Sequence, residues 1–308
     1  MLFSGGLAVT RIVLPDLVAR VRVCEARRVP VSMNGEQPMK GDESMSDRYF
    51  YLGPDTALVR LMDGHYLFVD PQDETVSTHL IGRGYWETWV QKAIAAVLRP
   101  GNRAIEVGSN TGVHTMTMAR AVGANGRVTA VEANPRLAEL LARSIEYNGY
   151  AGRIGLYKGA ANDVDGELVF QTSRRNGGGG HTLVYENIFG AETITVRVPA
   201  ARLDTMVGNP VDFIRLDAEG SEPQILAGAA NHLANPDILI CMEWDAFQMN
   251  LRTSVPAFIE SLTETGFRFW RIETDVTLTE LSPEAIAEAP HCEVFVSRHQ
   301  PPLPAKNL

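Results

Sequence analysis

The stretch "NRAIEVGSNTGVHTMTMARAV", residues 102–122, gives the strongest indication of the fold. Residues 102–108 are predicted to form a short apolar strand, and residues 111–122 are predicted to form a helix. Gly108 and Gly112 let the loop backbone pass close to a ligand, and the helix that follows offers unpaired N–H groups. A strand, a glycine-containing loop and a helix in this order are typical of an α/β sheet that binds a ligand at its edge.

The same alternation continues along the chain. Residues 127–133 are predicted to form a second strand, and Asn134 and Pro135 suit the cap and first position of a helix over 135–149. Further strands are predicted at 153–161, 212–218, 237–244, 267–272 and 292–298, and further helices at 221–233 and 255–266. The near-continuous apolar strands predict an α/β fold with a doubly wound, mostly parallel, Rossmann-like sheet, to which the last two strands would add an antiparallel edge.

The first 84 residues are expected to form a small N-terminal extension. Residues 34–47 are polar and predict a linker, and residues 56–70 predict a β-hairpin that turns at Asp63-Gly64.

The Rossmann-like domain is expected over residues 85–308. It would begin with a helix over 85–98, which ends before Pro100 and Gly101. An insertion is expected at 163–210, and it contains the four consecutive glycines of "SRRNGGGGH".

The composition describes an ordinary globular protein. The chain has 308 residues, of which 45% are hydrophobic and 21% charged, and its formal net charge is −9. This negative charge argues against nucleic acid or an anionic membrane as a partner. No run approaches a membrane span, and the three cysteines lack the spacing of a disulfide framework or a zinc site, so we expect a cytoplasmic protein.

The glycine loop differs from the one that binds dinucleotides. Asn110 occupies the second glycine position of the G-x-G-x-x-G fingerprint, and Val113 follows Gly112, so a pyrophosphate site is not predicted. Glu132 ends the second strand, where an acid can accept hydrogen bonds from both ribose hydroxyls. This pair of features favours a nucleoside without phosphates, of which S-adenosyl-L-methionine is the commonest cofactor. Turn glycines and an acid at a helix start are the alternative interpretation.

Three carboxylates lie within six positions of the stretch "VDFIRLDAEGSEPQIL", residues 211–226. Ligands of such sheets bind beyond the carboxyl ends of the strands, so Asp217 and Glu219 are predicted to be working acids. Ser221 and Gln224 predict a capping box, which makes Glu222 structural.

Two further residues are candidates for the same rim of the sheet. Glu243 ends the next strand, and His181 follows the four glycines, where it would close over the site. Three acids on one rim can hold Mg²⁺, but we expect no metal.

Three ordered motifs resemble the FkbM-type family of S-adenosylmethionine-dependent methyltransferases. They are "EVGSNTG" at 106–112, "VEANP" at 131–135 and "LDAEGSE" at 216–222. The helix "GYWETWVQKAI" and the segment "ARLDTMV" are also similar to this family. The resemblance covers about residues 80–245, while His114 and the glycine-rich insertion depart from the family pattern.

The resemblance implies a methyltransferase that uses S-adenosyl-L-methionine, with a hydroxyl on a sugar or polyketide-type natural product as acceptor. The expected cofactor-binding residues are Glu106, Gly108, Asn110, Gly112, Glu132, Asn162 and Asp217. The expected catalytic residues are Asp217, Glu219, Glu243 and His181.

Several alternatives remain open from the sequence. They are methyl transfer to nitrogen, an NAD-type dehydrogenase on the same class of fold, and a module that binds the cofactor without turnover. The expected partner is a small-molecule acceptor, and a homodimer is a further alternative.

Overall fold

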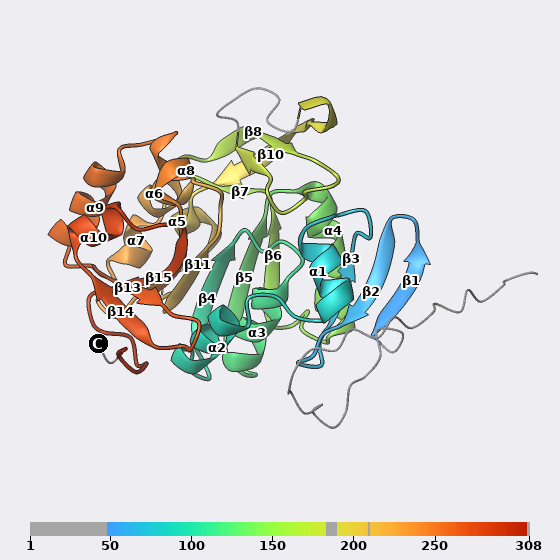
Figure 1. The fold of residues 1–308 in the computed structure, drawn as a ribbon, viewed down its shortest axis with the longest axis horizontal. Helices are drawn as coiled ribbons and strands as arrows, with labels where there is room; N and C mark the ends of the chain where they lie inside the picture. Colours follow the sequence, from blue (N-terminus) through green and yellow to red (C-terminus); the bar gives the residue numbers. More distant parts are fainter. Residues whose placement is uncertain (1–47, 183–189, 209, 307–308) are drawn as a thin grey trace, which may run out of the picture. The chain divides into compact units, whose positions relative to one another are not determined.

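The computed structural model describes residues 48–182, 190–208 and 210–306, which are coloured in Figure 1. An eight-stranded sheet forms its centre, in the order β14-β13-β15-β12-β11-β4-β5-β6. Five strands are parallel: β4 (Arg103–Val107), β5 (Arg127–Glu132), β6 (Ile154–Lys158), β11 (Phe213–Leu216) and β12 (Leu239–Trp244). Three more are antiparallel: β13 (Arg268–Ile272), β14 (Leu278–Leu281) and β15 (Cys292–Ser297). The predicted doubly wound sheet with an antiparallel edge is confirmed, and β14 is an addition to it.

Helices cover both faces of this sheet (Figure 1). The larger apolar core lies on one face, under α2 (Thr88–Val97), α3 (Val113–Ala121) and α4 (Pro135–Tyr147). A second core lies on the other face, under α6 (Glu222–Ala227), α8 (Ala246–Asn250) and α9 (Val255–Glu264). Shorter helices complete the domain: α5 (Leu203–Met206), α7 (Ala230–Leu233) and α10 (Pro283–Ala287).

Two predicted helices differ from the observed ones at glycine or left-handed positions. The helix predicted over 221–233 is divided at Gly228, where the backbone lies so close to Asn162 that a Cβ would stand 2.0 Å from its carbonyl oxygen. The helix predicted over 85–98 begins only at Thr88, because Glu87 has left-handed backbone angles (φ 40°, ψ 53°).

The insertion forms a second sheet beyond the carboxyl ends of β4, β5 and β6 (Figure 1). Its strand order is β7-β10-β8-β9, with β7 (Ala160–Ala161), β8 (Gly166–Thr172), β9 (His181–Thr182) and β10 (Ile194–Ala201). This second sheet therefore overhangs the edge at which α/β sheets bind ligands.

A three-stranded antiparallel sheet precedes the main domain. The predicted hairpin is confirmed as β2 (Thr56–Arg60) and β3 (Tyr66–Val69), and β1 (Tyr49–Gly53) pairs with β2 on the other side. The helix α1 (Val76–Arg83), which was not predicted, follows it. The predicted linker at 34–47 lies outside the described residues.

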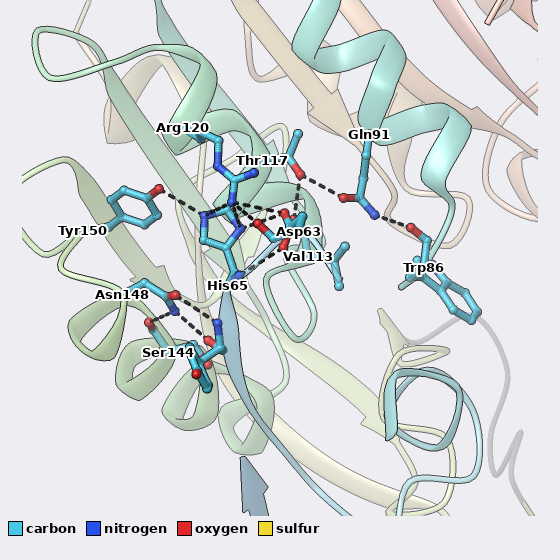
Figure 2. A network of polar contacts seen from close by, with 11 residues as sticks. Asp63, His65, Trp86, Gln91, Val113, Thr117, Arg120, Ser144, Asn148 and Tyr150 are labelled. Carbon is cyan, nitrogen blue, oxygen red and sulfur yellow. Dashed lines mark hydrogen bonds and ion pairs between the residues drawn. The ribbon is translucent and has the colours of Figure 1, made fainter. Parts of the chain in front are cut away.

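Side chains at the C-terminal end of α4 hydrogen bond to the backbone of β3: Ser144 in its last turn and Asn148, the residue that caps it (Figure 2). Asn148 accepts a hydrogen bond from Tyr66 N at 3.0 Å and donates one to Tyr66 O at 2.6 Å. One helical turn earlier, Ser144 Oγ accepts a hydrogen bond from Phe68 N at 2.9 Å. These two side chains supply partners that a neighbouring strand would otherwise provide.

A buried histidine joins the hairpin turn to α3 (Figure 2). His65 lies 2.8 Å from Asp63 Oδ2 through Nδ1 and 3.1 Å from the Tyr150 hydroxyl through Nε2. Arg120, from the last turn of α3, also donates to the carbonyl oxygen of Asp63 at 2.9 Å. The hairpin is thus fixed to the main domain by polar contacts at two places.

We predict that Asn148→Ala destabilises the protein. The substitution leaves both backbone groups of Tyr66 without their partner, which costs about 1–3 kcal/mol in the free energy of unfolding. Urea denaturation of the full chain measures this loss. The matched control is Asn231→Ala at an exposed position of α7. Equal stability of the two variants would contradict the interpretation.

Candidate functional site

A cavity of about 590 Å³, its open mouth included, lies at the carboxyl ends of β4, β5 and β11. Apolar side chains form much of its wall: Leu137, Ala160, Ala161, Phe170 and Ile225. The polar side chains that line it are Asn110, Glu132, His181, Thr182, Asp217 and Ser221. An apolar cavity with a few convergent polar groups is the usual form of a small-molecule site.

Close backbone packing fixes the glycine loop at one side of this cavity. Gly108 has φ 81°, and a Cβ on it would lie 1.7 Å from the carbonyl oxygen of Asp217. Asn110 also adopts a left-handed conformation, with φ 49°. Gly112 caps α3, and its Cβ would meet Leu141 of α4 at 2.5 Å. Gly112 therefore serves helix packing, while Gly108 and Asn110 line the cavity.

Glu132 holds the loop after β4 and the start of α4. Its Oε2 accepts a hydrogen bond from Asn110 N and its Oε1 accepts one from Asn134 N, both at 2.7 Å. The side chain is buried, and this burial raises the pKa of Glu132 to about 7. A carboxylate has about four lone-pair sites, so two remain for hydroxyl donors in the cavity.

The glycine-rich segment of the insertion closes the cavity from above. A Cβ on Gly178 would lie 2.5 Å from Asn110 Nδ2, and one on Gly180 would lie 2.5 Å from Phe170 Cζ. Gly177 O accepts a hydrogen bond from Asn134 Nδ2 at 3.2 Å. Only residues without side chains let this backbone lie so near the glycine loop.

Contacts with the loop after β11 hold the end of this segment. Arg252 donates to Thr182 Oγ1 at 2.7 Å and to Thr182 O at 2.9 Å. The Thr182 and Ser221 hydroxyls are 3.2 Å apart.

The predicted capping box at the start of α6 is wrong. The Ser221 hydroxyl accepts no hydrogen bond from a helix N–H, and Glu222 instead accepts one from Ala218 N at 2.8 Å.

Arg215 lies fully buried in the middle of β11 and anchors Asp217. Its Nη2 is 3.2 Å from Asp217 Oδ2 and 2.8 Å from Glu293 Oε1, and its Nη1 donates to Leu216 O. The Asp217 side chain is 33% exposed, so it faces the cavity while one oxygen is held by Arg215.

Glu87 and His114 lie beside the same arginine. His114 Nε2 is 3.1 Å from Glu87 Oε2, which is 3.9 Å from Arg215 Nη2. Burial raises the pKa of Glu87, but the hydrogen bond and charge of His114 and the charge of Arg215 outweigh it, and the net pKa is lowered. Glu87 also has a left-handed backbone conformation, which costs energy at a residue other than glycine and is commoner at functional sites than elsewhere.

Glu243 and Glu293 face one another across β12 and β15. Glu243 Oε1 also accepts a hydrogen bond from His291 Nε2 at 2.7 Å. Burial, and then the charges of Asp217 and Glu293, raise the pKa of Glu243 to about 11. Burial raises the pKa of Glu293 to about 7 despite Arg215. At neutral pH, Glu243 therefore holds a proton.

The structure distributes the sequence-predicted residues over two regions. Gly108, Asn110, Glu132, His181 and Asp217 line the cavity. Glu219, Glu243 and Glu106 lie near Asp217, whose charge raises the pKa of each, but they are not part of the cavity wall. Asn162 lies outside both regions, where its N–H donates to Ala201 O.

Two of these acids have fixed hydrogen-bond partners. The Thr115 hydroxyl donates to Glu106, which burial holds at a pKa of about 8. Gln248 Nε2 donates to Glu219 Oε2 at 2.7 Å, and burial raises the pKa of Glu219 to about 7. Burial lowers the pKa of His181, so its ring is neutral in the closed cavity at neutral pH.

Sequence reasoning missed Arg215, Glu293 and the role of Glu87. Arg215 and Glu293 are single charged residues within the apolar strands "FIRL" and "CEVFVS". A charge inside a buried strand must be paired, and this was the available signal. Across the described ranges, no group of three or more His, Cys, Asp or Glu side chains is arranged to hold a metal ion, and no helix there could cross a membrane.

The model of the methyltransferase FkbM domain matches residues 106–269, more than half of the chain. Two curated relatives match over short segments. The protein-L-isoaspartate O-methyltransferase of Hyperthermus butylicus is 37% identical over 71 residues, which cover 21% of this chain and 30% of that protein. The enzyme of the same name from Ignicoccus hospitalis is 41% identical over 56 residues, 18% of this chain and 26% of that protein. The chain thus spans less than a third of these relatives.

Solved structures show a distant similarity of fold. The methyltransferase FkbM from Methylobacillus flagellatus is 12% identical, with a TM-score of 0.41, over 67% of this chain and 50% of that one. The O-methyltransferase from Bacillus cereus in complex with SAH is 14% identical, with a TM-score of 0.39, over 68% and 76%. These likenesses carry no argument about the reaction. The match to the family model over residues 106–269 shows that this chain belongs to the FkbM methyltransferase family, whose cofactor is S-adenosyl-L-methionine.

Proposed function

We propose that this chain transfers a methyl group from S-adenosyl-L-methionine to a hydroxyl oxygen of a small-molecule acceptor, a sugar or a polyketide-type natural product. One observation carries the proposal. The cavity has a nucleoside-binding acid, Glu132, on one side, and Asp217 on the other, where a cluster of further carboxyl groups begins. Asp217 therefore lies where the proposed cofactor cavity meets the carboxyl groups that would face an acceptor.

The residues of the cavity fit the cofactor. Glu132 has free lone pairs for two ribose hydroxyls, and Leu137, Phe170 and Ile225 supply apolar walls for a base. The backbone of Gly108 lies too close to Asp217 for any side chain at this position, so no side chain of residue 108 takes up space in the cavity. The close glycine segment over the opening would exclude water from the bound cofactor.

When bound, the cofactor would supply an electrophilic methyl group on a sulfonium. An acceptor oxygen would bond to the methyl carbon in line with the carbon–sulfur bond, whose electron pair would stay on sulfur. The chain must then orient the acceptor hydroxyl and accept its proton. Asp217 is the candidate for both tasks, because Arg215 fixes one carboxylate oxygen at 3.2 Å and the side chain remains partly exposed.

Glu243 cannot serve as the resting base. Its pKa of about 11 keeps the carboxyl protonated at neutral pH, and a carboxyl that already holds its proton cannot accept the proton of the acceptor hydroxyl. His181 lines the cavity with a neutral ring, and we propose that it contacts the acceptor rather than the proton.

We predict that Glu132→Gln and Asp217→Asn separate cofactor binding from turnover. Glu132→Gln should weaken S-adenosylhomocysteine binding by about tenfold or more, since hydroxyl acceptors are lost. Asp217→Asn should keep that affinity within about threefold and lower the rate of methyl transfer by about 10²-fold or more. Calorimetry with S-adenosylhomocysteine and a mass-spectrometric methylation assay measure the two effects.

The same titrations test the assignment of the cavity. NAD, titrated in parallel, should give no saturable heat. Wild-type affinity in Glu132→Gln would contradict the ribose assignment, and thermal denaturation of each variant shows whether the fold is retained. Methylation at nitrogen, located by mass spectrometry of the product, would overturn the assignment to a hydroxyl.

We predict a pH dependence of cofactor affinity that Glu132 controls. Because its pKa is about 7, the carboxylate that accepts ribose hydroxyls forms as the pH rises through 7 and is lost below it. S-adenosylhomocysteine should therefore bind about three- to tenfold more weakly at pH 6 than at pH 8. Calorimetry at both pH values checks this, and the dependence should shrink in Glu132→Gln. An unchanged dependence in the variant would assign it to another group.

A further inference from the structure

A surplus of carboxyl groups surrounds the proposed acceptor position. Glu87, Asp217, Glu243 and Glu293, here called the acid cluster, lie at the carboxyl ends of β11 and β12, the start of β15 and the start of α2. Arg215 contacts three of them, at 3.9 Å for Glu87, 3.2 Å for Asp217 and 2.8 Å for Glu293. Within the described ranges, Arg215 is the permanent cation that these ion pairs share.

Two histidines each contact one member of the acid cluster. His114 contacts Glu87 at 3.1 Å, and His291 contacts Glu243 at 2.7 Å with a ring that is 63% exposed. The cofactor would bring one sulfonium, which balances one carboxylate, and Asp217 is the acid that lines the cofactor cavity.

Glu293 provides an independent sign of a missing ligand. Its side chain is only 7% exposed, and Oε1 accepts a hydrogen bond from Arg215, but Oε2 has no partner among the described residues. A buried carboxylate oxygen without a donor costs free energy. Glu243 lies directly opposite in the sheet, where two ionised carboxylates would repel each other, so without a cation between them Glu243 keeps its proton.

We propose that the acceptor carries a protonated amine, which binds between Glu243 and Glu293 while Asp217 faces the hydroxyl to be methylated. This inference rests on the proposed function and narrows it to amino alcohols and amino sugars. The ammonium group supplies the donors that Glu293 Oε2 lacks and a charge that offsets the surplus. It also replaces the proton that Glu243 otherwise holds.

Proton release distinguishes this mode of binding from simple surface attraction. The titratable or charged groups around Glu243 are Asp217 and Glu219 after β11, Arg215 within it, Glu293 at the start of β15 and His291 just before that strand. An ammonium group placed among them favours the ionised carboxylate. Binding of 2-aminoethanol, which is fully protonated at pH 7.5, should therefore release about one proton per site.

The test is calorimetry on the full chain saturated with S-adenosylhomocysteine. Glucosamine and 2-aminoethanol are the amine probes, and glucose and ethylene glycol are their matched neutral probes, at constant ionic strength. We expect the amines to bind at least tenfold more tightly than their neutral counterparts. Repeating the titration in buffers of different ionisation enthalpy counts the protons released.

Variants assign the effect to the cluster. Glu243→Gln should abolish proton release and reduce the amine preference to less than threefold, and Glu293→Gln should reduce the preference alone. Glu260→Gln, at an exposed position of α9, is the matched control and should change neither quantity. Melting temperatures with S-adenosylhomocysteine confirm that each variant is folded.

Equal binding of amines and neutral probes, absence of amine binding, or a preference that survives both variants would overturn the inference. These outcomes are separate from failure of the proposed function. If S-adenosylhomocysteine does not bind, the proposed function itself is wrong. If it binds and neutral alcohols are methylated without any preference for amines, only the inference about the acceptor is wrong.

Discussion

A permanent positive charge buried inside the central sheet controls the arrangement of the site. Arg215 lies in β11 with 1% of its side chain exposed, and a guanidinium cannot lose its proton to escape the cost of burial. It therefore has to gather carboxylates, and Asp217, Glu293 and Glu87 come from three separate parts of the chain to meet it. The positions of the loop after β11, the antiparallel strand β15 and the start of α2 are coupled through this one side chain.

The cofactor side depends on a different constraint, which is the close approach of backbones. The Gly108 backbone lies against the Asp217 carbonyl, and the Gly178 backbone lies against Asn110. These contacts bring the loops after β4 and β11 and the insertion to one place. Ion pairs therefore order the carboxyl groups around Arg215, and close backbone contacts order the loops around the cavity.

The sequence predicted the parallel strands well because their apolar runs and helix caps are local signals. Asn134, for example, accepts a hydrogen bond from Arg136 N at the start of α4, as its position before Pro135 suggested. The same local logic failed at Ser221. Ser221 does precede the helix α6, as the pattern predicts, but its hydroxyl does not cap the helix. The hydroxyl lies beside Thr182, a residue 39 positions away whose approach no local pattern reveals.

The site was predictable in part for the same reason. Gly108, Asn110, Glu132 and Asp217 belong to motifs at strand ends, so topology alone brings them together. Glu293 could not be placed, because its role depends on the antiparallel pairing of β15 with β12, which joins residues about 50 positions apart. Arg215 stood within a quoted motif, but its importance lies in long-range ion pairs.

The contact between α4 and β3 has a geometric consequence of its own. Four residues of a helix rise about 6.0 Å, and two residues of a strand rise about 6.6 Å, so Ser144 and Asn148 match Phe68 and Tyr66 in spacing. A shift of the hairpin by a single residue would place backbone groups that point the other way before these two side chains. The spacing of Ser144 and Asn148 thus fixes the register of β3. The end of α4 also covers the edge of β3 with which a strand of another chain would need to pair.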